Sequence, residues 1–105
     1  MTTRDEDWWM YVLICADGTL YAGITNDLKK RIETHNRGKG SKYVRSRLPA
    51  TLGVAWNYGK SKIPAAMSEA AFKKLSRAQK LELLDTPGRW EGPDGHRPEW
   101  IKEVP

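Results

Sequence analysis

The sequence predicts a small α/β domain of the α+β type, because strand-like and helix-like patterns follow one another along the chain. Residues 8–14 form a continuous apolar and aromatic run typical of a buried strand, and a second short run at 19–24 follows after a turn. Apolar residues stand four apart in 27–36, as on the buried side of a helix, and alternate in 51–58, as in a strand. Two further helices are expected from Pro64 onward. The predicted order is therefore strand, strand, helix, strand, helix, helix.

The turn between the first two strands decides which side chains share a face of the hairpin. A two-residue turn at Asp17 and Gly18 would place Tyr11 and Tyr21 on opposite faces. A three-residue loop at 16–18, with a bulge at Gly18, would place the two tyrosines on the same face. We predict the three-residue loop, with Gly18 at a positive φ.

Local signals mark where the three helices begin. The side chains of residues 25–27 can each cap the free N–H groups of a first helical turn. Pro64 suits the first turn of the second helix. Residues 76–79 read Ser-Arg-Ala-Gln, a capping-box pattern, which predicts a short third helix with Leu81 and Leu84 turned inward.

The chain is expected to form one domain with two flanking segments. Its 105 residues suit a single core. Residues 1–7 form a polar N-terminal extension, 8–85 the domain, and 86–105 an irregular C-terminal tail rich in proline and glycine. We expect Trp90 and Trp100 to attach the tail to the domain.

Composition excludes several classes of protein. Hydrophobic residues make up 39% of the chain, enough for a compact core, which argues against wholesale disorder. No stretch approaches the roughly 20 apolar residues that span a bilayer, and the polar start is unlike a signal peptide. A single cysteine, Cys15, excludes a disulfide framework and a cysteine zinc site within one chain. We expect a cytoplasmic monomer that makes no membrane contact.

The positive charge is concentrated in one segment. The net charge is +5, yet residues 29–47 hold eight basic residues and only one acid, Glu33. Such a segment suits a polyanion-binding surface, and a solvated basic face without a partner is the alternative. A membrane-surface role is disfavoured because the segment lacks a wide apolar face. The basic residues are Lys29, Lys30, Arg31, Arg37, Lys39, Lys42, Arg45 and Arg47, of which all but Arg31 are candidates for nucleic-acid binding.

Short motifs along the chain resemble one known family. The most specific is 20–28, Leu-Tyr-Ala-Gly-Ile-Thr-Asn-Asp-Leu, followed by Arg31 and His35. Tyr11 stands ten residues before the tyrosine of this motif, and Glu69 lies in the second predicted helix. Over most of the predicted domain, the chain resembles the GIY-YIG nuclease superfamily, above all its short stand-alone bacterial members.

The resemblance implies a fold, an activity and a set of site residues. It implies a three-stranded antiparallel sheet flanked by helices, and phosphodiester hydrolysis with one divalent cation, Mg²⁺ or Mn²⁺. Carried over by motif, Tyr11 and Tyr21 are the two motif tyrosines and Arg31 is the helix arginine. Glu69 is the metal-binding carboxylate, and His35 matches a histidine of part of the superfamily.

These residue types suit the cleavage of a phosphodiester. Arg31 offers an always-ionised fork for phosphate oxygens, and Glu69 is a hard oxygen ligand suited to Mg²⁺. A tyrosine beside a cation can have a lowered pKa and take a proton from water. We assign Tyr21 as the base and Tyr11 as the residue that orients the water; the reverse, or a role for His35 as base, stays open.

The predicted function is a metal-dependent DNA nuclease, directed by the structure of the DNA and serving repair or processing. The alternative is a nucleic-acid-binding module without turnover. RNA as substrate, and a partner protein that supplies specificity, also stay open. The chain departs from many relatives in two ways: it has no asparagine after Asn57, and Ser68 stands where relatives tend to have arginine.

Overall fold

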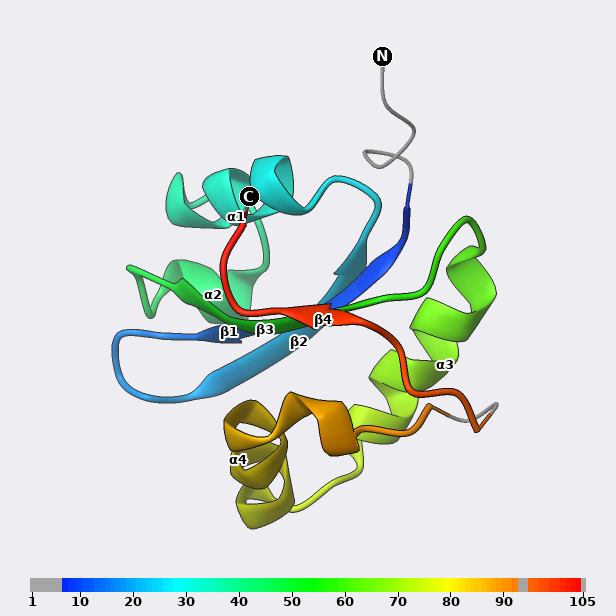
Figure 1. Ribbon diagram of the computed structural model, residues 1–105. Coiled ribbons are helices and arrows are strands. Elements are labelled where there is room, and N and C mark those ends of the chain that lie inside the picture. The colour runs from blue at the N-terminus through cyan, green and yellow to red at the C-terminus, as the bar shows by residue number, and fades with distance from the viewer. Residues whose placement is uncertain (1–6, 93–94, 105) are drawn as a thin grey trace.

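The computed structural model describes residues 7–92 and 95–104, which form a four-stranded sheet with helices on both faces (Figure 1). The elements, in chain order, are β1 (Trp9–Ile14), β2 (Leu20–Thr25), α1 (Leu28–Asn36), α2 (Lys42–Arg45), β3 (Thr51–Asn57), α3 (Lys62–Lys73), α4 (Arg77–Asp85), the 3₁₀ helix η2 (Pro87–Arg89) and β4 (Trp100–Ile101). The strand order is β2-β1-β3-β4, and every neighbouring pair is antiparallel. The α+β class and the antiparallel sheet are therefore confirmed.

The sheet has four strands, so the expectation of three strands is wrong by one. The additional strand, β4, pairs through Ile101 with Ala55 and through Trp100 with Trp56 of β3. Two residues are too short for an alternating pattern, and they follow a segment rich in proline and glycine. The strand forms because β3 offers an unpaired edge, which is a tertiary cause that local sequence patterns do not express.

The hairpin has the register that places the two motif tyrosines on one face. Leu13 lies opposite Tyr21 and Tyr11 lies opposite Gly23, which confirms the three-residue loop. Gly18 adopts a φ of 83°, a conformation that side chains other than glycine rarely accept.

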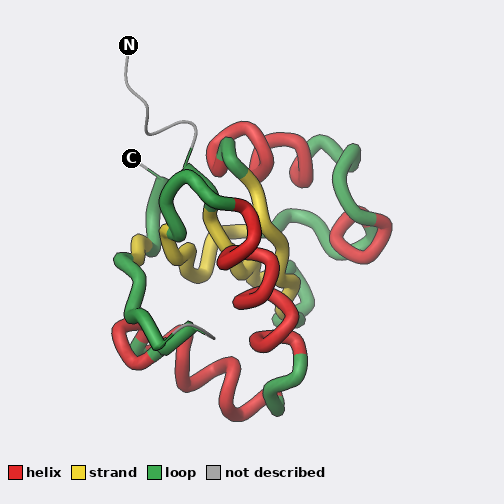
Figure 2. The backbone as a smooth tube through the Cα atoms, turned by 90° about the vertical axis from the view of Figure 1, so that its right-hand side faces the viewer, coloured by secondary structure: helices red, strands yellow, loops and turns green. Residues whose placement is uncertain are grey.

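Each face of the sheet is covered by a different pair of helices (Figures 1 and 2). α1 and α2 cover one face through Leu28 and Val44, which pack with Leu13 and Ala55. α3 and α4 cover the other face, where the buried members of the cluster are Met10, Val12, Ala22, Val54, Trp56, Phe72 and Trp90. No helix in the described part of the chain has the length and apolarity needed to cross a bilayer.

The helix starts follow the capping signals. Asp27 is the N-cap of α1 and accepts a hydrogen bond from the backbone N–H of Lys30. Ser76 and Gln79 form the predicted capping box at the start of α4. Leu84 packs inward with Leu83, whereas Leu81 is 42% exposed, so the expectation that Leu81 turns inward is wrong. The buried side of α4 runs through two adjacent leucines.

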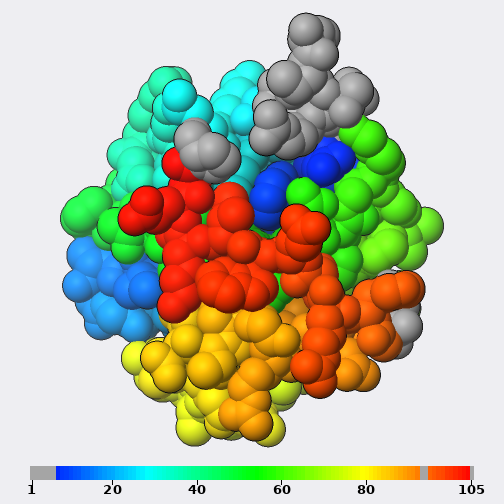
Figure 3. Space-filling model, in the orientation of Figure 1, coloured from blue at the N-terminus to red at the C-terminus, as the bar shows by residue number. Residues whose placement is uncertain are grey.

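The C-terminal segment packs against the domain through Trp90. This tryptophan is buried against Trp56 and Phe72, and its indole Nε1 lies 2.8 Å from the Ser68 hydroxyl on α3. Trp100 is 42% exposed and holds the segment through the backbone pairing of β4. Figure 3 shows the segment lying across the molecule between the region of α1 and α2 and that of α4.

Candidate active site

The centre of the candidate site is the buried phenol of Tyr11 on β1. Tyr11 is 2% exposed, and its hydroxyl lies 2.9 Å from Nε2 of His35, which is also 2% exposed. His35 is the penultimate residue of α1, so the hydrogen bond ties this helix to the middle of the sheet. In the described structure Nδ1 of His35 has no hydrogen-bond partner.

Tyr21 lies on the same face and completes a cluster of three rings. Its ring centroid is 6.5 Å from that of Tyr11 and 5.4 Å from that of His35. Unlike the other two, Tyr21 is only partly buried, so solvent reaches its side chain. A buried phenol and an accessible phenol therefore stand side by side.

Charged groups from two helices act on this cluster. Burial raises the pKa of Tyr11 well above its usual range; the nearby Tyr21 phenol raises it further, Arg31 on α1 lowers it, and Glu69 on α3 raises it. Burial also lowers the pKa of His35, and Arg31 lowers it further. These shifts favour a protonated Tyr11 and a neutral His35 at neutral pH. The structure thus brings Tyr11, Tyr21, Arg31, His35 and Glu69 into one electrostatic environment.

Glu69 offers a single, mostly buried carboxylate. Its side chain is 23% exposed and lies 3.3 Å from the ammonium of Lys73, one helical turn away. Among the described residues, no group of three or more His, Cys, Asp or Glu side chains could enclose a metal ion. Mg²⁺ suits such an open arrangement, because it keeps several water ligands when one or two carboxylates hold it. The donor set therefore fits Mg²⁺ or Mn²⁺ and does not fit a closed structural zinc site.

Two glycines border the ring cluster so closely that no side chain fits. A Cβ added to Gly23 would overlap the Tyr11 hydroxyl, and one added to Gly40 would overlap the His35 ring. Neither glycine has a positive φ, so the backbone conformation does not explain why glycine stands at these two positions. At Gly23 the group that approaches the backbone is the candidate catalytic phenol.

The basic residues predicted to bind nucleic acid differ in their exposure to solvent and in their contacts within the protein. Six of the seven are exposed, and they lie on α1 and its C-cap, in the following loop and on α2: Lys29, Lys30, Arg37, Lys39, Lys42 and Arg45. Arg37 stands 4.0 Å from Glu33, a distance at which an exposed pair contributes little. The loop expected between 38 and 49 contains the short helix α2, whose Ser41 cap accepts from Tyr43 and Val44.

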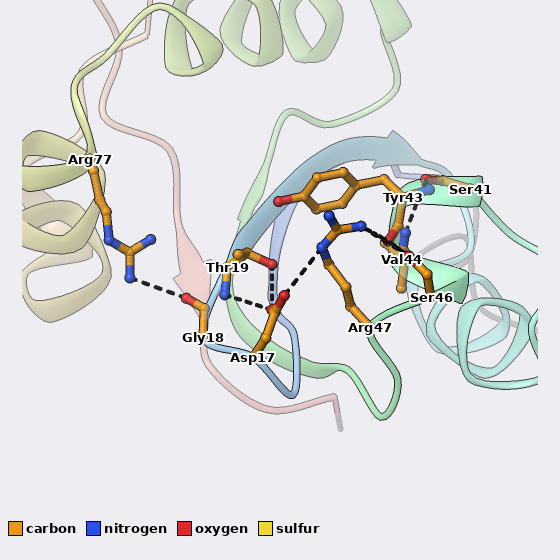
Figure 4. Close-up of polar contacts among 9 residues, drawn as sticks. All are labelled: Asp17, Gly18, Thr19, Ser41, Tyr43, Val44, Ser46, Arg47 and Arg77. Carbon is orange, nitrogen blue, oxygen red and sulfur yellow. Dashed lines mark hydrogen bonds and ion pairs between the residues drawn. The ribbon is translucent and has the colours of Figure 1, made fainter.

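Arg47 is held inside a network of the protein's own groups (Figure 4). Its guanidinium donates to the Tyr43 carbonyl at 2.8 Å and to the Ser46 hydroxyl at 3.0 Å. It also pairs with Asp17 of the hairpin loop at 3.2 Å and lies 3.9 Å from the centroid of the Tyr43 ring. Hydrogen bonds from Thr19 hold the pKa of Asp17 below its usual value, so this carboxylate stays ionised.

Tyr43 connects this network to the candidate site. Its ring stacks on that of Tyr21, with centroids 6.1 Å apart and planes at 24°. The sequence analysis assigned no role to Tyr43, although an aromatic residue amid basic ones is a signal for nucleic-acid binding. Through Arg47 and Asp17, the position of Tyr43 depends on the hairpin loop.

The substitution Asp17→Asn distinguishes two possible roles of Arg47: supporting Tyr43, or contacting a phosphate of the substrate. We expect Asp17→Asn to lower kcat of nucleic-acid cleavage by about tenfold without weakening substrate binding, because it loosens the support of Tyr43 beside Tyr21. If Arg47 instead serves as a phosphate contact, releasing it from Asp17 would tighten binding and leave kcat unchanged. Glu82→Gln is the matched control, since it makes the same charge change in the exposed pair with Arg89. Separate measurements of kcat and KM distinguish the two outcomes.

Comparisons with known proteins identify the family of the chain. Residues 7–82 match the family model described as the GIY-YIG catalytic domain. The chain is 53% identical to a UPF0213 protein of Streptococcus pyogenes serotype M5 over 87 residues, which cover 82% of this chain and 91% of the relative. A UPF0213 protein of S. pyogenes serotype M3 is 52% identical over the same shares.

Two solved structures are similar as well. The solution NMR structure of a UPF0213 protein from Bacillus halodurans is 40% identical, with a TM-score of 0.52 over 79% of this chain and 87% of that one. A protein from E. faecalis, also solved by NMR, is 38% identical, with a TM-score of 0.53 over 76% of this chain and 84% of that one. Both likenesses extend over most of each chain.

Proposed function

Because this chain belongs to the GIY-YIG catalytic-domain family and, within it, to the short UPF0213 proteins, we propose that it is a metal-dependent nuclease that hydrolyses phosphodiester bonds in DNA. The observation that carries the proposal is the setting of Tyr11. Its phenol is hydrogen-bonded to His35, faces Tyr21, and responds to the charges of Arg31 and Glu69. These are the groups that phosphodiester cleavage needs near one reacting water.

Each residue has a role that follows from its position. Glu69 would hold Mg²⁺ or Mn²⁺, which would stabilise negative charge on the phosphate and acidify water. Arg31 binds a non-bridging phosphate oxygen through its guanidinium fork. Tyr21, the more accessible of the two tyrosines, acts as phenolate and takes one proton of the attacking water. The water oxygen then bonds to phosphorus, and the bond from phosphorus to the leaving oxygen breaks.

Tyr11 holds that water in place and does not act as the base. Burial raises the pKa of its phenol, which favours the protonated form, and the hydroxyl is hydrogen-bonded to His35, whose lowered pKa favours the neutral form. His35 therefore fixes the direction of the Tyr11 hydroxyl. The buried position of both groups keeps this pair pre-organised before substrate arrives.

The exposed basic residues of α1, α2 and the loop between them support DNA as the polyanion. Lys29, Lys30, Lys39, Lys42 and Arg45 are exposed side chains of the kind that contact phosphates, and phosphates carry no sequence information. We therefore propose recognition of DNA structure, as in repair or processing, in preference to recognition of a sequence.

The test is cleavage of a panel of DNA structures by the purified chain. Single-stranded, nicked, flapped and branched DNA, with matched RNA, are incubated with Mg²⁺, with Mn²⁺ and with EDTA. We expect cleavage that requires the metal and differs between structures. Binding of these DNAs without cleavage under any metal would instead identify a binding module.

A further inference from the structure

A groove opens beside Tyr21, on the side of the site away from α1. It has a volume of about 290 Å³. Its lining comes from β2, α2, α3 and α4 and consists of Leu20, Tyr21, Ala22, Tyr43, Phe72, Lys73 and Lys80. The groove therefore joins the candidate base to residues more than forty positions further along the chain.

The course of the groove follows from the sheet order. β2 is an edge strand, so the helices on the two faces approach each other beyond it. Tyr21 points to the face covered by α1 and α2, whereas Leu20 and Ala22 point to the face covered by α3 and α4. The groove thus crosses the edge of the sheet and links its two faces.

The groove combines an apolar and aromatic lining with two lysines, Lys73 and Lys80. Lys73 is paired with Glu69, but Lys80 is partly buried with its ammonium 5.8 Å from the Phe72 ring centroid, and no carboxylate pairs with it among the described residues. A volume of about 290 Å³ lies at the lower limit of roughly 300 Å³ for small-ligand sites, so the groove suits a single nucleotide at most and excludes a duplex.

We propose that this groove binds the nucleotide next to the scissile phosphate, with its phosphate on Lys80 and its sugar and base against the apolar floor. The proposal rests on the proposed function, because it places the groove beside the reacting phosphate at Tyr21. It adds basic residues from α3 and α4, Lys73 and Lys80, to those of the segment 29–47. The substrate strand would then pass between the two helical layers at the edge of β2.

The proposal predicts that Lys80 contributes to substrate binding and not to turnover. We expect Lys80→Ala to raise KM for an oligodeoxynucleotide roughly three- to tenfold, with kcat nearly unchanged, and to reduce the slope of log affinity against log salt by about 0.7–0.9. Lys80→Arg should retain both properties. Lys74→Ala is the matched control, because Lys74 is exposed at the end of α3 and does not line the groove.

Binding measured in EDTA, by fluorescence anisotropy of a labelled oligonucleotide, keeps this proposal separate from the nuclease function. If the wild-type chain cuts no DNA yet Lys80→Ala binds more weakly than Lys74→Ala, the nuclease function fails and the groove remains a binding site. If the wild-type chain cuts DNA and the two variants bind and cut alike, the groove proposal is overturned.

Discussion

Glu69→Ala is expected to reduce kcat by on the order of 10³-fold while DNA binding persists, because it removes the carboxylate that we assign as the metal ligand. Glu69 is mostly buried, and the described residues form no cluster of three metal-ligating side chains. Loss of this group removes the stabilisation of charge in the transition state and leaves the exposed basic surface intact. The measurement is single-turnover cleavage at several Mg²⁺ and Mn²⁺ concentrations.

The control for Glu69→Ala is Glu33→Ala. Both substitutions remove one carboxylate from an i, i+4 pair with a basic residue, but the pair of Glu33 and Arg37 is exposed and lies outside the ring cluster. Equal thermal stability of the two variants would show that the fold is preserved. Full activity of Glu69→Ala would contradict the assignment of Glu69 as the metal ligand.

Tyr21→Phe is expected to lower kcat by about 10²–10⁴-fold, because it removes the hydroxyl that we assign as the general base. The ring remains, so its contacts with Tyr11, His35 and Tyr43 should persist. Quenched single-turnover reactions measure this loss.

Two further variants test whether the loss of activity is specific to the hydroxyl of Tyr21. Tyr43→Phe keeps the stacked ring and removes a hydroxyl with no assigned role, so its kcat should change little. Tyr11→Phe leaves the buried Nε2 of His35 without its partner and should destabilise the fold by about 1–3 kcal/mol. If Tyr11→Phe lowered kcat far more than Tyr21→Phe at equal stability, the roles of the two tyrosines would be reversed.

The sequence predicted those parts of the fold that local patterns encode. The three-residue loop, the positive φ of Gly18 and the capping box at Ser76 each depend on neighbouring residues, and all three are present. The shared face of Tyr11 and Tyr21 followed from the loop alone. β4 could not be predicted, because it depends on the edge of β3, far away in the chain.

The parts of the site that sequence reasoning missed depend on contacts between distant segments. The sequence marked Arg47 only as one of eight basic residues in the segment 29–47. In the structure it forms an ion pair with Asp17, thirty residues earlier in the chain. Lys80 lies outside the basic segment and reaches the site only because α4 packs beside β2. Gly40 makes room for His35 by its lack of a side chain, a contact that no local pattern indicates.

The contact between Trp90 and Ser68 gives the C-terminal segment a part in the site. Ser68 and Glu69 are neighbours on α3: one is fully buried and bonded to Trp90, and the other is the candidate metal ligand. A chain that ended after residue 85 would retain the whole region of the family match, 7–82, and every candidate site residue. It would lose the hydrogen bond between Trp90 and Ser68 that holds the helix carrying Glu69. The residues needed to position the candidate site therefore extend beyond the region of the family match.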